Sequence, residues 1–182
     1  MRPVAPILAA GLVAAGGTAA QAQTAQAQPT QPAQPVAAAV VKTVDQICMP
    51  LLDGAELKSV AKSTGLDEDD GEWRLEVDGD RGVVVDPPSG SNKTVCQATI
   101  TYAVDNGAPI VAALDGWASA HTLTKDKDRQ ASEGPLRMRK TTSWFGPVGS
   151  GNLAVVLSEE KQLDGKPVEG DLDQATLLVS KS

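Results

Sequence analysis

Thr94-Val95-Cys96-Gln97-Ala98-Thr99-Ile100-Thr101-Tyr102-Ala103-Val104 is the stretch that decides the fold, because its side chains alternate with a period of two residues. One face carries Cys96, Ala98, Ile100, Tyr102 and Val104, and the opposite face carries Val95, Gln97, Thr99 and Thr101. This alternation and the many β-branched residues predict a half-buried β-strand. We expect the folded domain to be built around this strand.

The apolar face of that strand carries Cys96, one of two cysteines in the chain; the other is Cys48. Two cysteines in an exported protein most economically form one disulfide. Closing a loop of about 49 residues stabilises the fold by about 4 kcal/mol in the chain-entropy model. A redox pair or a thiol nucleophile is the alternative, but redox pairs usually have the spacing Cys-x-x-Cys. We therefore predict a structural Cys48–Cys96 disulfide that fastens a helix to the central strand.

Residues 1–22 have the pattern of a secretory signal peptide. Arg2 provides a positive start, residues 7–15 form a short apolar run, and Ala20-Gln21-Ala22 is a small-x-small cleavage site. The apolar run is too short to be a convincing membrane span. We expect cleavage near Ala22, a periplasmic or extracellular location, and no transmembrane segment in the mature chain.

Residues 23–40 are rich in Gln, Ala and Pro and carry no charge. Pro29, Pro32 and Pro35 interrupt any helix, so this segment is expected to be a disordered or polyproline-like linker. A proline-rich recognition segment is the alternative, although no basic or aromatic residue accompanies the prolines. The folded part is then expected to be a single domain over residues 41–182.

The remaining patterns predict an α+β domain. Helices are expected at residues 44–52, interrupted by Pro50, at 54–64, with Asp53 and Glu56 as a capping box, and at 109–121. Strands are expected at residues 73–77, 83–85, 94–104, 136–142, 153–157 and 175–179. Residues 67–72 and 122–135 are polar and are expected to be an acidic loop and a mobile loop. These elements predict two layers, in which helices cover one face of an antiparallel sheet of about five or six strands, and the 109–121 helix lies over the central strand.

Charge and composition exclude several classes of partner and cofactor. The formal net charge of −7 disfavours nucleic acid and anionic lipid surfaces. Zinc requires about four Cys or His ligands, which one histidine and two disulfide-bonded cysteines do not supply. We expect no metal, no cofactor and a monomer.

A catalytic site is not indicated. His121 is the one histidine, and its place in the last turn of a helix is explained by the helix dipole. Carboxylate pairs such as Glu159-Glu160 and Asp171 with Asp173 occur, but sequence alone does not bring two carboxylates to a catalytic separation. We expect no catalytic residue; the alternative is a small periplasmic hydrolase that uses His121 or a carboxylate pair.

Trp144 and Phe145 stand side by side at a strand end and are the candidate contact with a partner, because tryptophan is enriched at interfaces. The alternative is that the strand sends them to opposite faces, with one in the core. The sequence therefore predicts an exported, non-catalytic binding or envelope-associated protein. Its partner is expected to be a protein or a small ligand.

Overall fold

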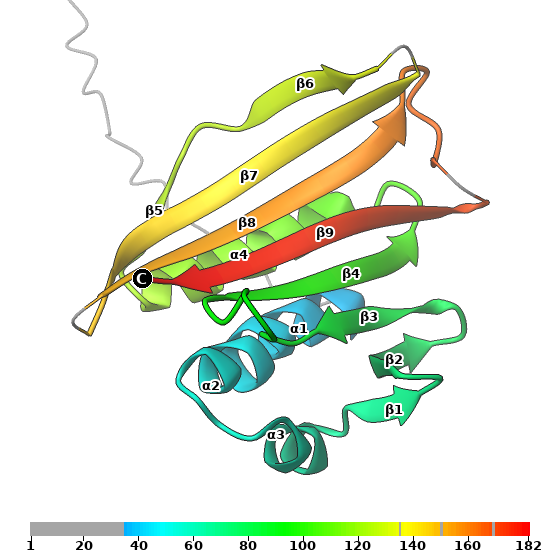
Figure 1. Ribbon diagram of the computed structural model, residues 1–182. Coiled ribbons are helices and arrows are strands. Elements are labelled where there is room, and N and C mark those ends of the chain that lie inside the picture. The colour runs from blue at the N-terminus through cyan, green and yellow to red at the C-terminus, as the bar shows by residue number, and fades with distance from the viewer. Residues whose placement is uncertain (1–34, 135, 150, 169) are drawn as a thin grey trace, which may run out of the picture. The chain divides into compact units, whose positions relative to one another are not determined.

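An antiparallel sheet dominates the computed structural model of this chain, which describes residues 35–134, 136–149, 151–168 and 170–182 (Figure 1). The predicted signal peptide and residues 23–34 of the predicted linker lie outside these residues. The helices are α1 (Pro35–Lys42), the π-helix η1 (Thr43–Cys48), α2 (Met49–Leu52), α3 (Leu57–Thr64) and α4 (Gly107–Ala120). The strands are β1 (Asp67–Asp69), β2 (Glu72–Asp78), β3 (Arg81–Asp86), β4 (Val95–Ala103), β5 (Thr124–Lys125), β6 (Arg129–Glu133), β7 (Arg137–Val148), β8 (Gly151–Gln162) and β9 (Leu172–Lys181).

The nine strands of the described residues are ordered β1-β2-β3-β4-β9-β8-β7-β5, and β6 also pairs with β7. The α+β class, the antiparallel sheet and the single disulfide are confirmed. The described residues form nine strands, more than the predicted five or six. The C-terminal strand β9 lies between β4 and β8, so the β7–β8–β9 meander closes against the central strand.

The central strand is β4, one residue shorter at each end than the predicted 94–104. Cys96, Ala98, Ile100 and Tyr102 are all buried, as the alternation predicts, whereas Val104 lies beyond the strand end and is exposed. We call the face that these buried side chains share the inner face of the sheet. Cys48, the last residue of η1, forms the predicted disulfide with Cys96, and their Cα atoms are 5.5 Å apart.

The helix that begins at Pro35 corrects the predicted linker. Residues 35–40 are helical, and Val36 and Val40 are buried in the core. These two side chains extend the apolar stripe of Val44 by successive steps of four residues, and proline suits the first turn of a helix. The window 35–52 is long and apolar enough to span a bilayer by length and composition, yet half of it is buried inside the protein, as in a core helix.

Pro50 does not end this helix. It stands in the first turn of α2, directly after the π-helical segment η1. Proline is tolerated in a first turn because the N–H group that it lacks is not required there for a helical hydrogen bond. Helix α3 starts at Leu57, later than predicted, because Asp53 caps the C-terminus of α2 and does not begin the next helix. Gly65 ends α3 in the left-handed conformation (φ 69°), as expected.

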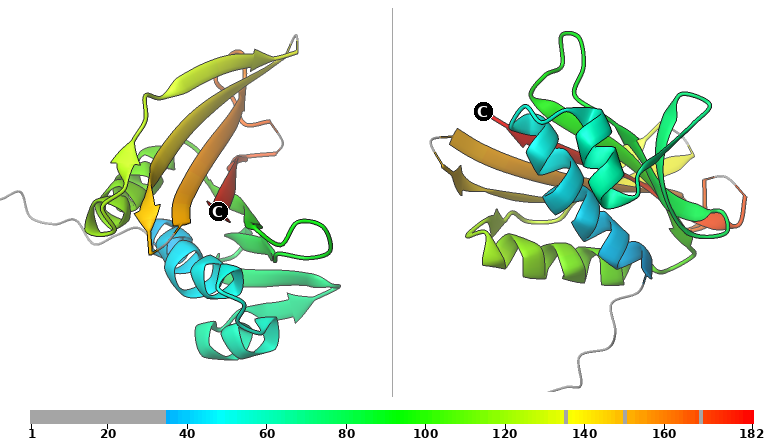
Figure 2. Two further views of the ribbon diagram at one scale, coloured as in Figure 1. Left: turned by 60° about the vertical axis from the view of Figure 1, so that its left-hand side comes forward. Right: turned by 90° about the horizontal axis from the view of Figure 1, so that it is seen from below.

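Helix α4 begins two residues before the predicted 109–121. It packs beside α1, as the view from below in Figure 2 shows. The closest helical contacts with β4 come from η1 and α2. Helix α4 is joined to β7 by the hydrogen bond between Trp144 and Asp115, and its first residue, Gly107, lies against Glu159 of β8.

Two predicted loops contain strands. The polar segment 122–135 includes β5 and β6, which both pair with β7, and the acidic segment 67–72 includes β1, which pairs with β2. Side chains of β1 and β5 are exposed on both faces, and those of β6 are exposed from residue 129 to 132. Backbone pairing and surface ion pairs hold such strands, so they lack the apolar alternation that reveals a strand in a sequence.

Candidate functional site

The inner face of the sheet is apolar at one end and charged at the other. Along β8, Leu153, Val155 and Leu157 are buried, and Glu159 and Lys161 follow at the same spacing of two residues. The neighbouring strands change in the same way. Trp144 and Thr142 of β7 give way to Lys140 and Met138, and Val179, Leu177 and Ala175 of β9 give way to Asp173.

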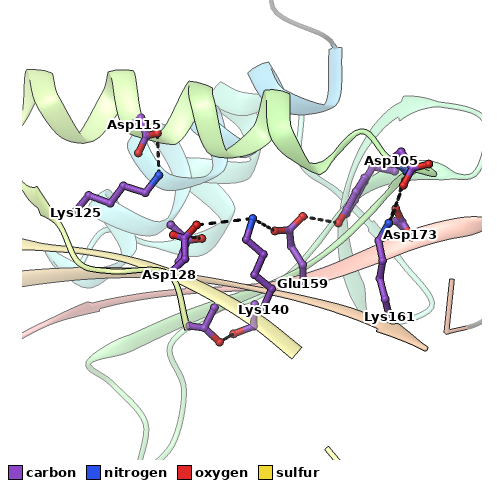
Figure 3. Close-up of polar contacts among 12 residues, drawn as sticks. Asp105, Asp115, Lys125, Asp128, Lys140, Glu159, Lys161 and Asp173 are labelled. Carbon is purple, nitrogen blue, oxygen red and sulfur yellow. Dashed lines mark hydrogen bonds and ion pairs between the residues drawn. The ribbon is translucent and has the colours of Figure 1, made fainter. Parts of the chain in front are cut away.

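A cavity of about 230 Å³ opens at this charged end, next to the first residues of α4. We call it the α4 pocket. Its lining residues come from the β4–α4 turn, from α4 and from four strands: Asp105, Gly107, Ala108, Gln130, Met138, Lys140, Glu159, Lys161 and Asp173. Figure 3 shows the charged side chains of this region between α4 and the sheet.

Asp173 and Lys161 hold the β4–α4 turn in place. The Asp173 side chain is 1% exposed, and its Oδ2 atom accepts a hydrogen bond from the Asp105 main-chain N–H at 2.9 Å. Lys161 Nζ lies 3.1 Å from Asp173 Oδ2 and 2.9 Å from Asp105 Oδ1. The hydrogen bond with Asp105, followed by that with Asp173, raises the pKa of Lys161 against the opposing effect of burial. Asp105 adopts a left-handed backbone conformation (φ 63°), which this pair of contacts fixes.

Glu159 lies against the start of α4. Its Oε1 atom accepts a hydrogen bond from the Tyr102 hydroxyl at 3.3 Å, and its Oε2 atom is 3.6 Å from Lys140 Nζ. A Cβ atom on Gly107 would lie 1.9 Å from Glu159 Oε1, so this position of the carboxylate requires glycine at the first residue of the helix. Burial, and then the negative charges of Glu159 and Asp173, strongly raise the pKa of Tyr102. Tyr102 therefore remains a hydroxyl donor to Glu159.

Lys140 is the cation that the pocket leaves most open. It stands between Glu159 and Asp128, at 3.6 and 3.9 Å, both beyond hydrogen-bond distance, and its side chain is 38% exposed. The Thr142 hydroxyl donates to Asp128 Oδ1 at 3.1 Å and orients that carboxylate. Lys161, in contrast, is engaged at short range by two carboxylates.

The electrostatic balance of the lining is slightly negative. Two lysines face three carboxylates, Asp105, Glu159 and Asp173, which gives a formal charge of 2 − 3 = −1. The second oxygen of Asp173, Oδ1, is buried and has no hydrogen-bond donor among the described residues. Such an atom is costly to bury, since an unsatisfied acceptor loses its hydration. The described residues contain no group of three or more His, Cys, Asp or Glu side chains that could hold a metal ion.

His121, the candidate for catalysis, does not belong to this pocket. It caps the opposite end of α4, where its ring stacks on Trp117 and its Nδ1 atom lies 2.8 Å from the Trp117 carbonyl oxygen. Its Nε2 atom is 3.6 Å from Asp45 Oδ1, which also accepts a hydrogen bond from Trp117 Nε1. These contacts join α4 to η1 and give the histidine a structural explanation.

Trp144 and Phe145, the candidate partner contacts, lie on opposite faces of β7. Trp144 is 1% exposed, and its Nε1 atom donates to Asp115 Oδ1 at 2.8 Å. The indole is thus part of the core and is not available to a partner. Phe145 is 45% exposed and remains a candidate for partner contact.

The structure brings together a carboxylate pair that the sequence did not suggest. Glu159 and Glu160 point to opposite faces, and Glu160 contacts Arg139 on the outer one. Asp171 is exposed and precedes β9. The carboxylates that meet at the pocket are Glu159 and Asp173, from the neighbouring strands β8 and β9. The signal for them was the series Leu157-x-Glu159-x-Lys161, whose spacing of two residues places charges on the face of the core.

Comparison with known proteins finds no matching family model, no similar curated protein and no similar solved structure.

Proposed function

We propose that this protein is an exported, non-catalytic binding protein that holds a small polar ligand in the α4 pocket. The observation that carries this proposal is the charged lining of a 230 Å³ cavity on the same sheet face as the core. Drug-sized ligands occupy pockets of roughly 300–1,000 Å³, so the ligand is expected to be smaller than these.

The state of the charged groups favours a neutral or cationic ligand. Lys140 makes only long contacts, and its N–H groups are available to an acceptor. A donor group of the ligand would complete the contacts of the carboxylates, which outnumber the lysines at the pocket. An anion would meet a lining with a net negative charge, in a protein of formal charge −7.

Export is part of the proposal and rests on the N-terminal pattern together with the disulfide. Residues 1–22 have the features of a cleaved secretory signal, and disulfides persist in oxidising compartments. The expected location is the periplasm or the outside of the cell. We further infer a two-layer domain in which α1 and α4 cover the inner face, while the outer face, with Phe145, stays open to a protein partner or the cell envelope.

A hydrolase is the second candidate, because Glu159 and Asp173 line one pocket. Acid–base catalysis requires two groups in different protonation states, one of them held as the acid. Here each carboxylate contacts a lysine ammonium, Glu159 that of Lys140 and Asp173 that of Lys161. Both carboxylates thus serve the same role of ion pairing, so binding is the better supported function.

Titration of the mature protein with small neutral, cationic and anionic compounds, followed by amide NMR, tests the proposal. Compounds of the first two classes should shift the amides of Gly107, Lys140 and Lys161. Glu159→Gln should weaken binding about tenfold, the equivalent of about 1.4 kcal/mol. Glu160→Gln is the matched control, since it changes the adjacent residue on the opposite face.

Two results would contradict the proposal. If none of the compounds shifts amides at the pocket, or if both glutamate variants weaken binding equally, the α4 pocket is not the site. Conversion of a compound during the titration, lost in Glu159→Gln, would support the hydrolase.

A further inference from the structure

The two edges of the sheet differ in charge. The sheet ends at β1 on one side, and among the described strands β6 pairs with β7 alone on the other. An unpaired edge presents free N–H and C=O groups that can pair with another strand. Side chains decide whether such pairing is opposed or favoured.

The β1 edge opposes pairing with a second copy of itself. Asp67, Glu68 and Asp69 are all exposed. An antiparallel pair centred on Glu68 would place Asp67 of each copy opposite Asp69 of the other and Glu68 opposite its own equivalent. Like charges directly opposite each other are destabilising.

The β6 edge has the opposite property. Its sequence is Arg129-Gln130-Ala131-Ser132-Glu133, with a basic residue at the start and an acidic residue at the end. If a twofold axis perpendicular to the sheet relates two copies paired through β6, the inner faces of both copies lie on the same side. Each residue of β6 then lies opposite a residue of the second copy on the same face, so the two residue numbers are both odd or both even. Of the possible centres, only Ala131 places Arg129 opposite Glu133, and it does so twice.

We propose that β6 pairs antiparallel with β6 of a second copy and joins the two sheets into one. Arg129 is 78% exposed, and its ion pair with Asp126 at 3.1 Å lies at the surface, so exchanging it for a partner carboxylate costs little. Glu133 lies 2.8 Å from Arg139 Nη1 and would then accept from two guanidinium groups. The sequence predicts a monomer and a mobile loop at residues 122–135, and β6, which provides this unpaired edge, lies within that segment.

The dimer would also bring the two α4 pockets close to each other. Gln130 lines the pocket from β6 and in this register faces Ser132 of the second copy. Five residue pairs form a small interface by the standard of specific complexes, which marks a weak and concentration-dependent dimer. The proposal is independent of the function assigned to the pocket, because it rests on the edge alone.

A single cysteine tests the register. Directly opposed residues of an antiparallel pair have Cα atoms about 4.5–5.5 Å apart, within the range of a disulfide. Ala131→Cys should therefore give a disulfide-linked dimer on oxidation of the mature protein. Ser132→Cys is the matched control. The two Ser132 residues of the dimer would be offset from each other by two positions, so their Cα atoms would lie more than 7 Å apart. Cys48 and Cys96 are bonded to each other and do not interfere.

At least tenfold more crosslinked dimer from Ala131→Cys than from Ser132→Cys supports the proposal. Equal crosslinking of the two variants, or none from either, overturns it. Capture of a different protein by Ala131→Cys in place of a second copy overturns it as well.

Charge exchange gives a second test by sedimentation at high protein concentration. Arg129→Glu alone and Glu133→Arg alone each place like charges opposite one another, and each should lose the self-association of the wild type. An equal mixture of the two variants restores both opposite-charge pairs and should form a heterodimer. Circular dichroism of each variant verifies folding. Self-association of either single variant at the wild-type level, or a mixture that stays monomeric, overturns the proposal.

Discussion

Along β8, Leu153, Val155 and Leu157 face the helices and are fully buried, whereas Glu159 and Lys161 face the same way and border a cavity. The alternation of the strand is the same in both halves. The difference lies in α4, whose first residue, Gly107, is placed directly against Glu159. Beyond that point no part of α4 covers the strands, and the polar side chains of the inner face border the α4 pocket. Coverage by a helix therefore separates the core from the pocket.

Trp144→Ala should give the largest effect, because it removes the largest fully buried side chain of the apolar half. The cost should be about 3–5 kcal/mol in the free energy of unfolding, as for other buried aromatic residues. Urea denaturation measures it. Phe145→Ala is the control from the adjacent, exposed position and should change stability by no more than about 0.5 kcal/mol. An unchanged midpoint for Trp144→Ala would show that the indole is not in the core.

Gly107→Ala sharpens the boundary between the two halves. The new methyl group would displace the Glu159 carboxylate, the far end of a flexible side chain, from Tyr102 and Lys140, and the loss of these contacts should cost about 1 kcal/mol. Gly116→Ala in the same helix meets no atom within 4 Å and should stabilise by about 0.8–1 kcal/mol. The melting temperature, measured by thermal denaturation, should thus fall for Gly107→Ala and rise for Gly116→Ala.

Removal of the Glu159 carboxylate should abolish the destabilisation that Gly107→Ala causes. In a Glu159→Ala background the contact that Gly107→Ala creates is absent, and the substitution should no longer be destabilising. If Gly107→Ala remains destabilising by the same amount there, the carboxylate is not what requires glycine.

The parts of the fold that the sequence predicts are those with buried, periodic side chains. Strand β4, the disulfide and helix α4 have such patterns, and each is found close to its expected bounds. Strands β1 and β6 carry almost only exposed side chains, and backbone pairing to a neighbour creates them. Helix α1 is not predicted for a different reason. Its alanines and its one proline resemble those of the preceding segment, although Val36 and Val40 continue the apolar stripe of the next helix.

The candidate site was less predictable than the fold because it depends on pairing between distant segments. The sequence places Glu159 and Lys161 on the face of Leu157, but it does not say which strand lies beside them. Asp173 reaches the pocket because β9 inserts between β4 and β8, and Asp105 reaches it through the turn that follows β4. Long-range pairing of this kind leaves no local pattern.

Tyr102 gives the smallest effect and reports on the boundary directly. Burial and the nearby carboxylates raise its pKa in the folded state above the value of about 10 for a free tyrosine. A raised pKa contributes stability that is complete below pH 10 and is lost as the pH rises further, because the unfolded chain then loses a proton that the folded protein keeps. The raised pKa of Lys161 acts in the same direction above its ordinary value of 10.5.

The chain has one tyrosine, so the near-ultraviolet absorbance of tyrosinate reports Tyr102 alone. Between pH 10 and 11 that absorbance should rise only when urea unfolds the protein. Tyr102→Phe should lose about 1 kcal/mol at pH 7 with the hydrogen bond to Glu159, yet lose less further stability than the wild type above pH 10. Ionisation of Tyr102 near pH 10 in the folded protein would mean that solvent reaches the hydroxyl. The charged half of the inner face would then include Tyr102 of β4.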